Sequence, residues 1–492
     1  MTLPINLYSS EQVRELDRIA IEDFGILGIV LMKRAGQATF NSLLKNYPSA
    51  KSITIICGTG NNGGDGYIIA MLAFNAKLNV KLIQLGKIEA IKGDALSARN
   101  AYLKTGAESL EFDGSLLDVD IVIDAIFGTG LDRDVQDDWA TTIDEVNKSS
   151  AMVISVDCPS GLNSDTGRVL GTAVNADLTV TYIGMKCGLL TGQARDYVGK
   201  LEFYDLDVPE EIYQRLTDFV DKSIIPKNII QQNLGRRPRC SHKGNFGHVL
   251  LIGGFEGMSG AITLAAEASL RVGAGLVSIA TDSIHANCLN TNRPEFMVSG
   301  IDQAEALLPL IDKSTVIVIG PGLGKSDRAR ELLSVAFKSG NPKVLDADAL
   351  NLLASLEKQD DNWILTPHPA EAARLLGCDT QEIEQDRFES TSKIVKTRGG
   401  VLILKGAGSL ISDGNKTSVC TLGNPGMSSG GMGDVLSGII GGLLAQELPL
   451  YEAAKTGVFI HAKAADLAVQ KGGERGLLAS DLFPYIRHLV NE

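Results

Sequence analysis

Cysteine pairs with the spacing of a disulfide scaffold or a metal site are missing from this sequence. Seven cysteines are scattered over 492 residues, with no C-x-x-C pair and no cluster. An odd, dispersed set predicts free thiols in a reducing compartment. These residues are Cys57, Cys158, Cys187, Cys240, Cys288, Cys378 and Cys420.

Long apolar runs and an excess of positive charge are missing as well. No apolar stretch approaches the roughly 20 residues that span a bilayer, and the N-terminus lacks a basic segment followed by an apolar one. The formal net charge is -13, which argues against the basic stripe that nucleic acid requires. We therefore expect a soluble, cytoplasmic protein that binds neither membranes nor nucleic acid. We expect a homo-oligomer only because symmetric homo-oligomers are common among soluble proteins.

The pattern that is present is typical of an α/β protein with more than one domain. A chain of 492 residues exceeds the size at which a single hydrophobic core usually stops growing. Its 53 glycines follow no collagen-like period and indicate many tight turns. Short β-branched runs alternate with longer amphipathic stretches, which predicts parallel sheets with crossover helices.

Two series of predicted strands divide the chain into domains over residues 1–220 and 221–492, with the junction near 215–230. The segment between the two strand series carries a basic RRPR run (236–239), which predicts a solvated segment rather than a binding patch. The opening stretch SSEQVRELDRIAIEDFGI predicts a helix with Ser10 as its N-cap. The predicted strands are 52–58, 80–86, 120–128, 152–161, 177–184 and 200–208, then 247–254, 275–281, 314–324, 343–348, 362–369 and 400–406.

The first glycine-rich loop, GTGNNGGDG (58–66), lies between a predicted strand and a helical stretch. It satisfies G-x-G-x-x-G, but the next strand ends in Gln, Gly and Lys instead of the acidic residue that holds a ribose. We therefore reject a standard dinucleotide site. Asn61, Asn62 and Asp65 still offer amide and carboxylate groups at the mouth of a parallel sheet, where ligands bind. The alternative is that these residues only form a turn.

Two further strand ends carry polar residues of the same kind. DAIFGTGLDRDV (124–135) begins with Asp124, and SVDCPSGLNSDTG (155–167) contains Asp157 and Ser160. A buried carboxylate is unfavourable unless it is hydrogen-bonded or holds a cation. Asn, Asp and Ser oxygens suit an alkali or alkaline-earth cation. Each Asp alone could equally cap a helix or form a turn.

Together these three segments resemble the signature segments of the NAD(P)H-hydrate epimerase family, over roughly residues 1–215. The resemblance implies a Rossmann-like three-layer domain that interconverts the R and S forms of hydrated NADH or NADPH. It also implies a potassium ion held by Asn62, Asp124 and Ser160. Epimerisation at a hydroxylated ring carbon needs reversible proton transfer, and Asp157 is the carboxylate we choose for it. The implied substrate-binding residues are Asn61, Asn62, Gly63, Gly64, Asp65, Gly128, Thr129, Gly130, Leu131, Asp132, Arg133, Asp134 and Asp157.

Two motifs in the second half are misleading. GPGLGKS (320–326) is one residue too short between its glycines for a Walker A loop. HPAE (368–371) has no second histidine four residues on, so zinc is not predicted. Pro369 at a first helical turn fits a helix start, and His368 could be no more than a neighbour of the cap.

The informative stretch is TLGNPGMSSGGMGDVLSGIIGGLLA (421–445), in which small residues and Asp434 precede an apolar helix. Backbone N–H groups at a helix start can hold the oxygens of a transferring phosphate. An Asp there can accept the proton of the attacking hydroxyl. The alternative is a helix contact with Asp434 as the N-cap.

With KGAGS (405–409), IGPGLGK, DADALNLL and TPHPAEAARLLG, this stretch resembles the ribokinase-like superfamily, and closely its branch of NAD(P)H-hydrate dehydratases, over about 240–492. The resemblance implies a ribokinase-like three-layer domain that phosphorylates the ring hydroxyl with Asp434 as base and then eliminates phosphate. It implies ADP, or ATP, with magnesium. The implied hydrate-binding residues are Ala261, Gly322, Gly324, His368 and Asp434. The implied nucleotide-binding residues are Lys405, Gly406, Ala407, Gly408, Ser409, Asn424, Pro425, Gly426, Met427, Ser428, Ser429, Gly430, Gly431, Met432 and Gly433.

Three hypotheses follow from these motifs. The leading one is a bifunctional repair enzyme for nicotinamide nucleotide hydrates, because spontaneous hydration gives both epimers and the dehydratase consumes one. The second is a ribokinase-like small-molecule kinase with an appended binding domain, which predicts a stable phosphorylated product. The third is a nucleotide sensor without turnover. Nothing in the sequence selects NADH over NADPH.

Overall fold

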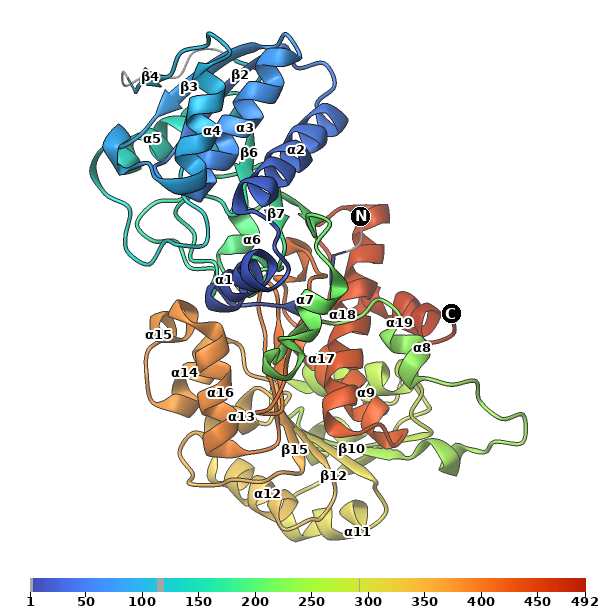
Figure 1. Ribbon diagram of the computed structural model, residues 1–492. Helices are drawn as coiled ribbons and strands as arrows, with labels where there is room; N and C mark the ends of the chain where they lie inside the picture. Colours follow the sequence, from blue (N-terminus) through green and yellow to red (C-terminus); the bar gives the residue numbers. More distant parts are fainter. Residues whose placement is uncertain (1–2, 113–118, 292) are drawn as a thin grey trace. The chain divides into compact units, whose positions relative to one another are not determined.

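Two sheets of mainly parallel strands organise the chain, one in each of two units (Figure 1). The computed structural model describes residues 3–112, 119–291 and 293–492. We call Met1–Ser223 the N-terminal unit and Ile224–Glu492 the C-terminal unit. Within the described residues, no helix combines the length and the apolar character needed to cross a membrane.

The sheet of the N-terminal unit has seven strands in the order β4-β3-β2-β5-β6-β7-β8, and every neighbouring pair runs parallel. The order reverses beside β2, the point at which open parallel sheets bind their ligands. The strands are β2 (Ser52–Cys57), β3 (Asn79–Gln84), β4 (Leu110–Glu111), β5 (Ile121–Ala125), β6 (Met152–Val156), β7 (Leu178–Tyr182) and β8 (Lys200–Tyr204).

Both faces of this sheet are covered, which makes the unit a three-layer sandwich. Successive side chains of a strand point to opposite faces. Ile53 and Ile55 accordingly join the cluster beneath α2 (Gly28–Asn46) and α3 (Asn61–Asn75), whereas Ile56 joins the cluster beneath α5 (Asp137–Lys148). The remaining helices are α4 (Gly93–Leu103), α6 (Ala194–Tyr197) and α7 (Glu210–Gln214).

The predicted first helix is present but begins differently from the prediction. The N-cap of α1 (Ser10–Arg18) is Ser9 and not Ser10, because Ser9 and Gln12 form a reciprocal capping box. Ser10 instead donates from its hydroxyl to the carboxylate of Asp165 at 2.8 Å. The helix continues as a π-helical turn over Ile19–Asp23. Before it, β1 (Asn6–Leu7) pairs antiparallel with β9 (Lys222–Ile224).

The sheet of the C-terminal unit runs in the order β18-β17-β16-β15-β14-β13-β10-β11-β12. It is parallel from β16 to β12, and β17 and β18 add an antiparallel edge. The strands are β10 (His248–Ile252), β11 (Leu276–Thr281), β12 (Met297–Gly300), β13 (Val316–Ile319), β14 (Lys343–Leu345), β15 (Trp363–Leu365), β16 (Val401–Leu404), β17 (Leu410–Ser412) and β18 (Thr417–Val419).

Helices lie on both sides of this sheet too (Figure 1). On one side lie α8 (Ile229–Asn233), α9 (Ser259–Val272), α17 (Met432–Ala445), α18 (Leu450–Gly472) and α19 (Phe483–Leu489). The remaining helices of the unit are α10 (Ser283–Ala286), α11 (Leu308–Ile311), α12 (Asp327–Phe337), α13 (Asp348–Leu353), α14 (Pro369–Leu376), α15 (Thr380–Gln385) and α16 (Arg387–Arg398).

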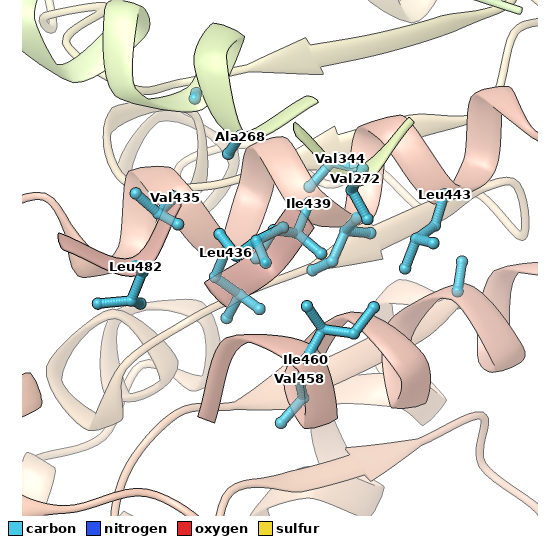
Figure 2. Close-up of a cluster of buried hydrophobic side chains, with 14 of the residues drawn as sticks. Ala268, Val272, Val344, Val435, Leu436, Ile439, Leu443, Val458, Ile460 and Leu482 are labelled. Carbon is cyan, nitrogen blue, oxygen red and sulfur yellow. The ribbon is translucent and has the colours of Figure 1, made fainter. Parts of the chain in front are cut away.

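Helix α17 lies at the centre of this core. Every residue from Val435 to Ala445 is buried, as expected for a helix that is apolar on all sides. Figure 2 shows Ile439 and Leu443 grouped with Val272 of α9, and Ile460 of α18 lies in the same cluster. Helices α9 and α17 approach closely because small residues line their contact. This packing fixes the first turn of α17, where Asp434 lies.

Candidate active sites

The N-terminal unit has a cavity of about 530 Å³ at the carboxyl ends of its central strands. The loops after β2, β5 and β6 form much of its wall, as the sequence predicts for an open parallel sheet. Predicted site residues in the wall are Asn61, Asn62, Asp65, Gly128, Thr129, Gly130, Leu131 and Asp157. The helices α1 and α2 supply the apolar side chains opposite them.

Asp157 lies directly after β6 with a backbone φ of 65°, a conformation that is rare for a residue with a side chain. Its carboxylate accepts hydrogen bonds from the ammonium of Lys186 and from the hydroxyl of Thr181, the latter at 3.2 Å. Lys186 is 1% exposed and also donates to the Tyr182 carbonyl at 2.9 Å. The ion pair therefore fixes the carboxylate at the cavity wall with its charge balanced.

Asp65 and Asp17 are among the other carboxyl groups that line this cavity. Burial, with the charge of Asp157 as the next contribution, raises the pKa of Asp65 well above its usual range. Burial also raises the pKa of Asp17 to about 6, and the charge of Lys186 opposes this shift. Groups in one cavity with different proton affinities are what acid–base chemistry at neutral pH requires.

The three predicted cation ligands have different surroundings. Both polar side-chain atoms of Asn62 are buried and have no hydrogen-bond partner among the described residues. Asp124 is fully buried, and its carboxylate accepts from the hydroxyls of Ser155 and Ser160 at 2.8 and 2.5 Å. Burial raises the pKa of Asp124, and these hydrogen bonds oppose that shift. The unpaired amide of Asn62 is the observation that fits an additional ligand.

Five predicted substrate-binding residues lie outside the cavity wall. Gly63 and Gly64 are buried in α3, and a Cβ atom on Gly63 would lie 2.0 Å from the Gly58 carbonyl oxygen. These two glycines serve close backbone packing. The other three follow Leu131 as an exposed loop, and they are Asp132, Arg133 and Asp134.

In the C-terminal unit, the predicted segments meet at the carboxyl edge of β10, β13, β14 and β16. The loops after β10 and β13 are joined by backbone hydrogen bonds, including Phe255 N–H to the Gly322 carbonyl at 2.8 Å. Gly322 has a φ of 60°, and a Cβ atom there would meet the Met258 carbonyl oxygen at 2.7 Å. Ala261 lies in the first turn of α9, directly after this junction. Gly324 donates from its N–H to Asp348 at 2.9 Å.

Asp434 is the third residue of α17, and the N-cap is Gly431 with a φ of 92°. The alternative in which Asp434 caps the helix is therefore wrong. Burial raises the pKa of Asp434 to about 7, the negative charge of Asp346 adds to the shift, and Lys405 opposes it. A carboxylate with this pKa can accept a proton at neutral pH and later release it.

Lys405 follows β16 and forms an ion pair that the sequence did not predict. Its ammonium donates to Asp346 Oδ1 at 2.9 Å and lies 3.7 Å from Glu371 Oε2. Burial would lower the pKa of Lys405, but the charges of Asp346 and Glu371 reverse the shift and raise it. The ammonium is thus charged and anchored beside Asp434.

His368 is the N-cap of α14 itself, not a neighbour of the cap. Its Nδ1 accepts from the N–H of Ala370 at 3.1 Å, and Glu371 completes the capping box by accepting from the His368 N–H at 2.9 Å. Burial lowers the pKa of His368, and the charges of Lys405 and Arg374 add to this. The lowered pKa favours the neutral imidazole, with Nδ1 as the acceptor of the backbone N–H groups.

The predicted nucleotide-binding segments form two partly exposed turns. Gly406, Ala407 and Ser409 are accessible after β16, and most residues from Asn424 to Gly433 are at least partly exposed. The side chain of Asn424 donates to Asp466 at 2.9 Å, and its oxygen accepts from the Gly426 N–H at 3.0 Å. The loop is thus held in shape, while its backbone N–H groups lead into the first turn of α17.

The C-terminal unit has a cavity of about 1210 Å³ that lies away from these predicted segments. Arginines supply much of its polar lining, and it is bounded by the segment 230–246 and the ends of α9 and α19. Among the described residues, none of the predicted dehydratase residues lines it. Volume alone therefore does not locate the chemistry of this unit.

Comparison with known proteins decides the family. A family model described as NAD(P)H-hydrate dehydratase matches residues 249–488, and one described as YjeF-related protein N-terminus matches residues 28–188. The bifunctional NAD(P)H-hydrate repair enzyme Nnr of Coxiella burnetii is 48% identical, with 99% of both chains covered. The same enzyme of Escherichia coli is 40% identical over 100% of this chain and 95% of its own. The chain belongs to this family.

Solved structures extend the family assignment to the fold of the C-terminal unit. An ADP/ATP-dependent NAD(P)H-hydrate dehydratase from Bacillus subtilis, co-crystallised with ATP and Mg²⁺, is 26% identical with a TM-score of 0.50. A ribokinase-like superfamily protein from Enterococcus faecalis is 29% identical with a TM-score of 0.52. They cover 54% and 55% of this chain and 96% of their own chains. The ribokinase-like fold predicted from the sequence is confirmed.

Proposed function

We propose that the C-terminal unit restores NADH or NADPH from the hydrate by a nucleotide-dependent dehydration with Asp434 as the base. The observation that carries this proposal is a carboxyl group with a pKa of about 7 in the first turn of α17, beside the anchored ammonium of Lys405. The family supports it, since it pairs this fold with dehydration rather than with a stable phosphorylated product.

The chemistry explains why a kinase fold can serve a dehydration. Water adds to the enamine double bond of a reduced nicotinamide at the carbon next to nitrogen, and hydroxide is a poor leaving group. Asp434 accepts the hydroxyl proton while the ring oxygen attacks the terminal phosphorus of the nucleotide. The bond from this phosphorus to the rest of the nucleotide breaks, and the nucleotide leaves with one phosphate fewer. The ring then loses phosphate from that carbon and a proton from the adjacent carbon. The double bond is restored, and the products are NAD(P)H, inorganic phosphate and the shortened nucleotide.

The protein groups in this scheme bind and orient the hydrate and the nucleotide. Backbone N–H groups before Asp434 would hold the transferred phosphate, and Lys405 would neutralise its charge. Ala261, Gly322, Gly324 and His368 would face the hydrate. Magnesium would arrive with the nucleotide phosphates, because Mg²⁺ is commonly held by substrate phosphates. The B. subtilis relative, described as ADP/ATP-dependent and co-crystallised with ATP and Mg²⁺, supports either ADP or ATP as the donor.

We propose that the N-terminal unit interconverts the two epimers of the hydrate in its 530 Å³ cavity. The reacting carbon carries both a hydroxyl group and the ring nitrogen, so its configuration inverts when one of these bonds breaks and re-forms on the other face. Either route moves a proton to one heteroatom and from another. We assign this transfer to Asp157, because its carboxylate lies at the cavity wall, where the ammonium of Lys186 holds it in place.

A potassium ion at Asn62, Asp124 and Ser160 belongs to the same proposal. The amide oxygen of Asn62, which has no hydrogen-bond partner in the described part of the chain, supports it, and the buried carboxylate of Asp124 would supply charge. The Ser160 hydroxyl can keep its hydrogen bond to Asp124 and offer a lone pair to the ion. When bound, the cation would stabilise the loops around the cavity. The cysteines are scattered along the sequence without a C-x-x-C pair, which supports a cytoplasmic, reducing location.

A mixture of both epimers of hydrated NADH tests the whole proposal. With ADP or ATP present, the wild-type chain should restore the absorbance of reduced nicotinamide completely. Asp434→Asn should abolish recovery, and Asp157→Asn should stop it when the usable epimer is consumed, apart from slow spontaneous epimerisation. An Asp434→Asn enzyme with wild-type rates would refute the assigned base. A stable phosphorylated hydrate without restored NADH would indicate a small-molecule kinase instead.

A further inference from the structure

Asp346 is a buried carboxylate that opens the DADALNLL segment but to which the sequence assigned no role. It follows β14 and is 1% exposed. Its Oδ1 accepts from the Lys405 ammonium at 2.9 Å, and its Oδ2 accepts from the Ser437 hydroxyl at 2.7 Å. One carboxylate thus connects the end of β16 with the first turns of α17.

The backbone around Asp346 leaves it little freedom. Its N–H donates to the Ile319 carbonyl at 3.2 Å, and a Cβ atom on Gly320 would lie 1.8 Å from the Asp346 carbonyl oxygen. The next residue, Ala347, has a φ of 48°, which is strained for alanine. A strained residue persists only where its surroundings determine it, so the position of the Asp346 side chain is tightly set.

The Asp346–Lys405 pair lies against the part of α17 that carries Asp434. A Cβ atom on Gly433 would lie 3.3 Å from the Lys405 ammonium and 3.6 Å from Asp346 Oδ2. Ser437 lies three residues after Asp434, on the same side of the helix. The glycine at 433 therefore lets the ion pair approach the backbone directly beside Asp434.

The titratable groups around Asp434 come from four elements. Asp346 and Lys405 lie at the ends of β14 and β16, and Glu371 lies on α14 with a pKa that burial raises. His461 on α18 lies in the same network, and burial, together with the charge of Lys405, lowers its pKa to about 4. Asp346 and Lys405 are the charges that most affect the pKa of Asp434.

We propose that Asp346 is a positioning residue of the dehydratase site, holding the Lys405 ammonium and, through Ser437, the first turns of α17 so that Asp434 faces the transferred phosphate. This inference rests on the proposed dehydratase function. In this role Asp346 acts through Lys405 and Ser437 and not directly on the substrate or the nucleotide. Its charge has two effects of the same sign: it repels the ionised form of Asp434 directly, and it keeps Lys405 from pairing with that carboxylate.

Asp346→Asn in the full chain tests the inference through the pH dependence of dehydration. Without the negative charge, Asp434 ionises at lower pH, so the acidic limb of kcat/KM should move down by about one pH unit. The plateau should fall about tenfold to a hundredfold, because Lys405 loses its anchor. Ser437→Ala is the matched control. It removes one hydrogen bond and keeps the charge, so its plateau should fall less than tenfold and its limb should stay in place.

Asp346→Asn could leave Lys405 unpaired and fail to fold. In that case the double variant Asp346→Asn with Lys405→Gln, which removes both charges, carries the test. Lys405→Gln alone should move the limb to higher pH, and adding Asp346→Asn should move it back by about one unit. If the limb does not move on either background while the plateau falls in Asp346→Asn as it does in Ser437→Ala, Asp346 only braces the fold and the inference is overturned. Failure of the wild-type chain to dehydrate would instead refute the proposed function.

Discussion

The contact between α9 and α17 yields the sharpest prediction about stability. A Cβ atom added to Gly438 would lie 2.0 Å from the Ala265 carbonyl oxygen and 2.8 Å from its Cα atom. The Gly438 carbonyl also accepts from the Ser269 hydroxyl at 2.9 Å. Gly438→Ala must therefore separate the two helices by more than about 1 Å, because carbon and oxygen need roughly 3.3 Å or more.

The size of the effect follows from two opposing contributions. Overpacking in a core costs about 1–3 kcal/mol, and a clash with backbone belongs at the upper end of that range. Alanine recovers about 1 kcal/mol of helix propensity. We expect a net loss of about 2 kcal/mol, which lowers the Tm of a domain of this size by about 4–8 °C. Dehydratase activity should also fall, because Gly438 lies one turn after Asp434 and the helices move apart.

Calorimetry of the full chain, with Gly260→Ala as the matched control, measures this effect. Gly260 lies in the first turn of α9, and a Cβ atom there meets no heavy atom within 4 Å. The same substitution should therefore raise stability by about 0.5–1 kcal/mol. A Gly438→Ala variant as stable as the wild type would refute the close packing of α9 on α17.

Three further predictions concern the two sites and the first helix. The pKa of Asp434 is about 7, and the base must be ionised to accept a proton. Dehydratase kcat/KM should therefore be flat above that pH and fall about tenfold per pH unit below it. A profile that is flat down to pH 5 would contradict this assignment. Asn62→Leu should remove any stimulation of epimerisation by potassium while the C-terminal unit keeps its rate, and unchanged stimulation would exclude Asn62 as a ligand. Ser9→Ala should destabilise the N-terminal unit by about 1 kcal/mol in denaturant unfolding through loss of the capping box, and an unchanged midpoint would show that the box contributes nothing.

The sequence predicted the central sheets well because their strands are continuous apolar runs. Each of the twelve predicted strand ranges contains or overlaps a strand, for example β2 within 52–58 and β13 within 314–324. The short edge strands β17 and β18, each of three residues, were missed, since three residues show no alternation. The range 152–161 was too long, because the chain leaves the sheet after Val156.

The candidate sites were predicted where polar residues stand next to glycines, and missed where the fold alone brings residues together. Lys186 contacts Asp157 across 29 positions and belongs to no motif. Asp17 lies on an amphipathic helix whose other polar residues are largely exposed. Asp346 did carry a signal: it lies at the end of a strand, as Asp124 and Asp157 do, and it opens the DADALNLL segment, but neither feature alone gives it a role.

Oxygen-18 in the ring hydroxyl distinguishes phosphorylation followed by elimination from direct loss of water, because only the first route carries the ring oxygen into inorganic phosphate. Hydrated NADH whose ring hydroxyl carries oxygen-18 is incubated with the wild-type chain and unlabelled nucleotide, and the inorganic phosphate is analysed by mass spectrometry. We expect one labelled oxygen in the phosphate for each NADH restored, and no labelled phosphate with Asp434→Asn. Label that appears in water while NADH is restored would contradict transfer of phosphate to the hydroxyl.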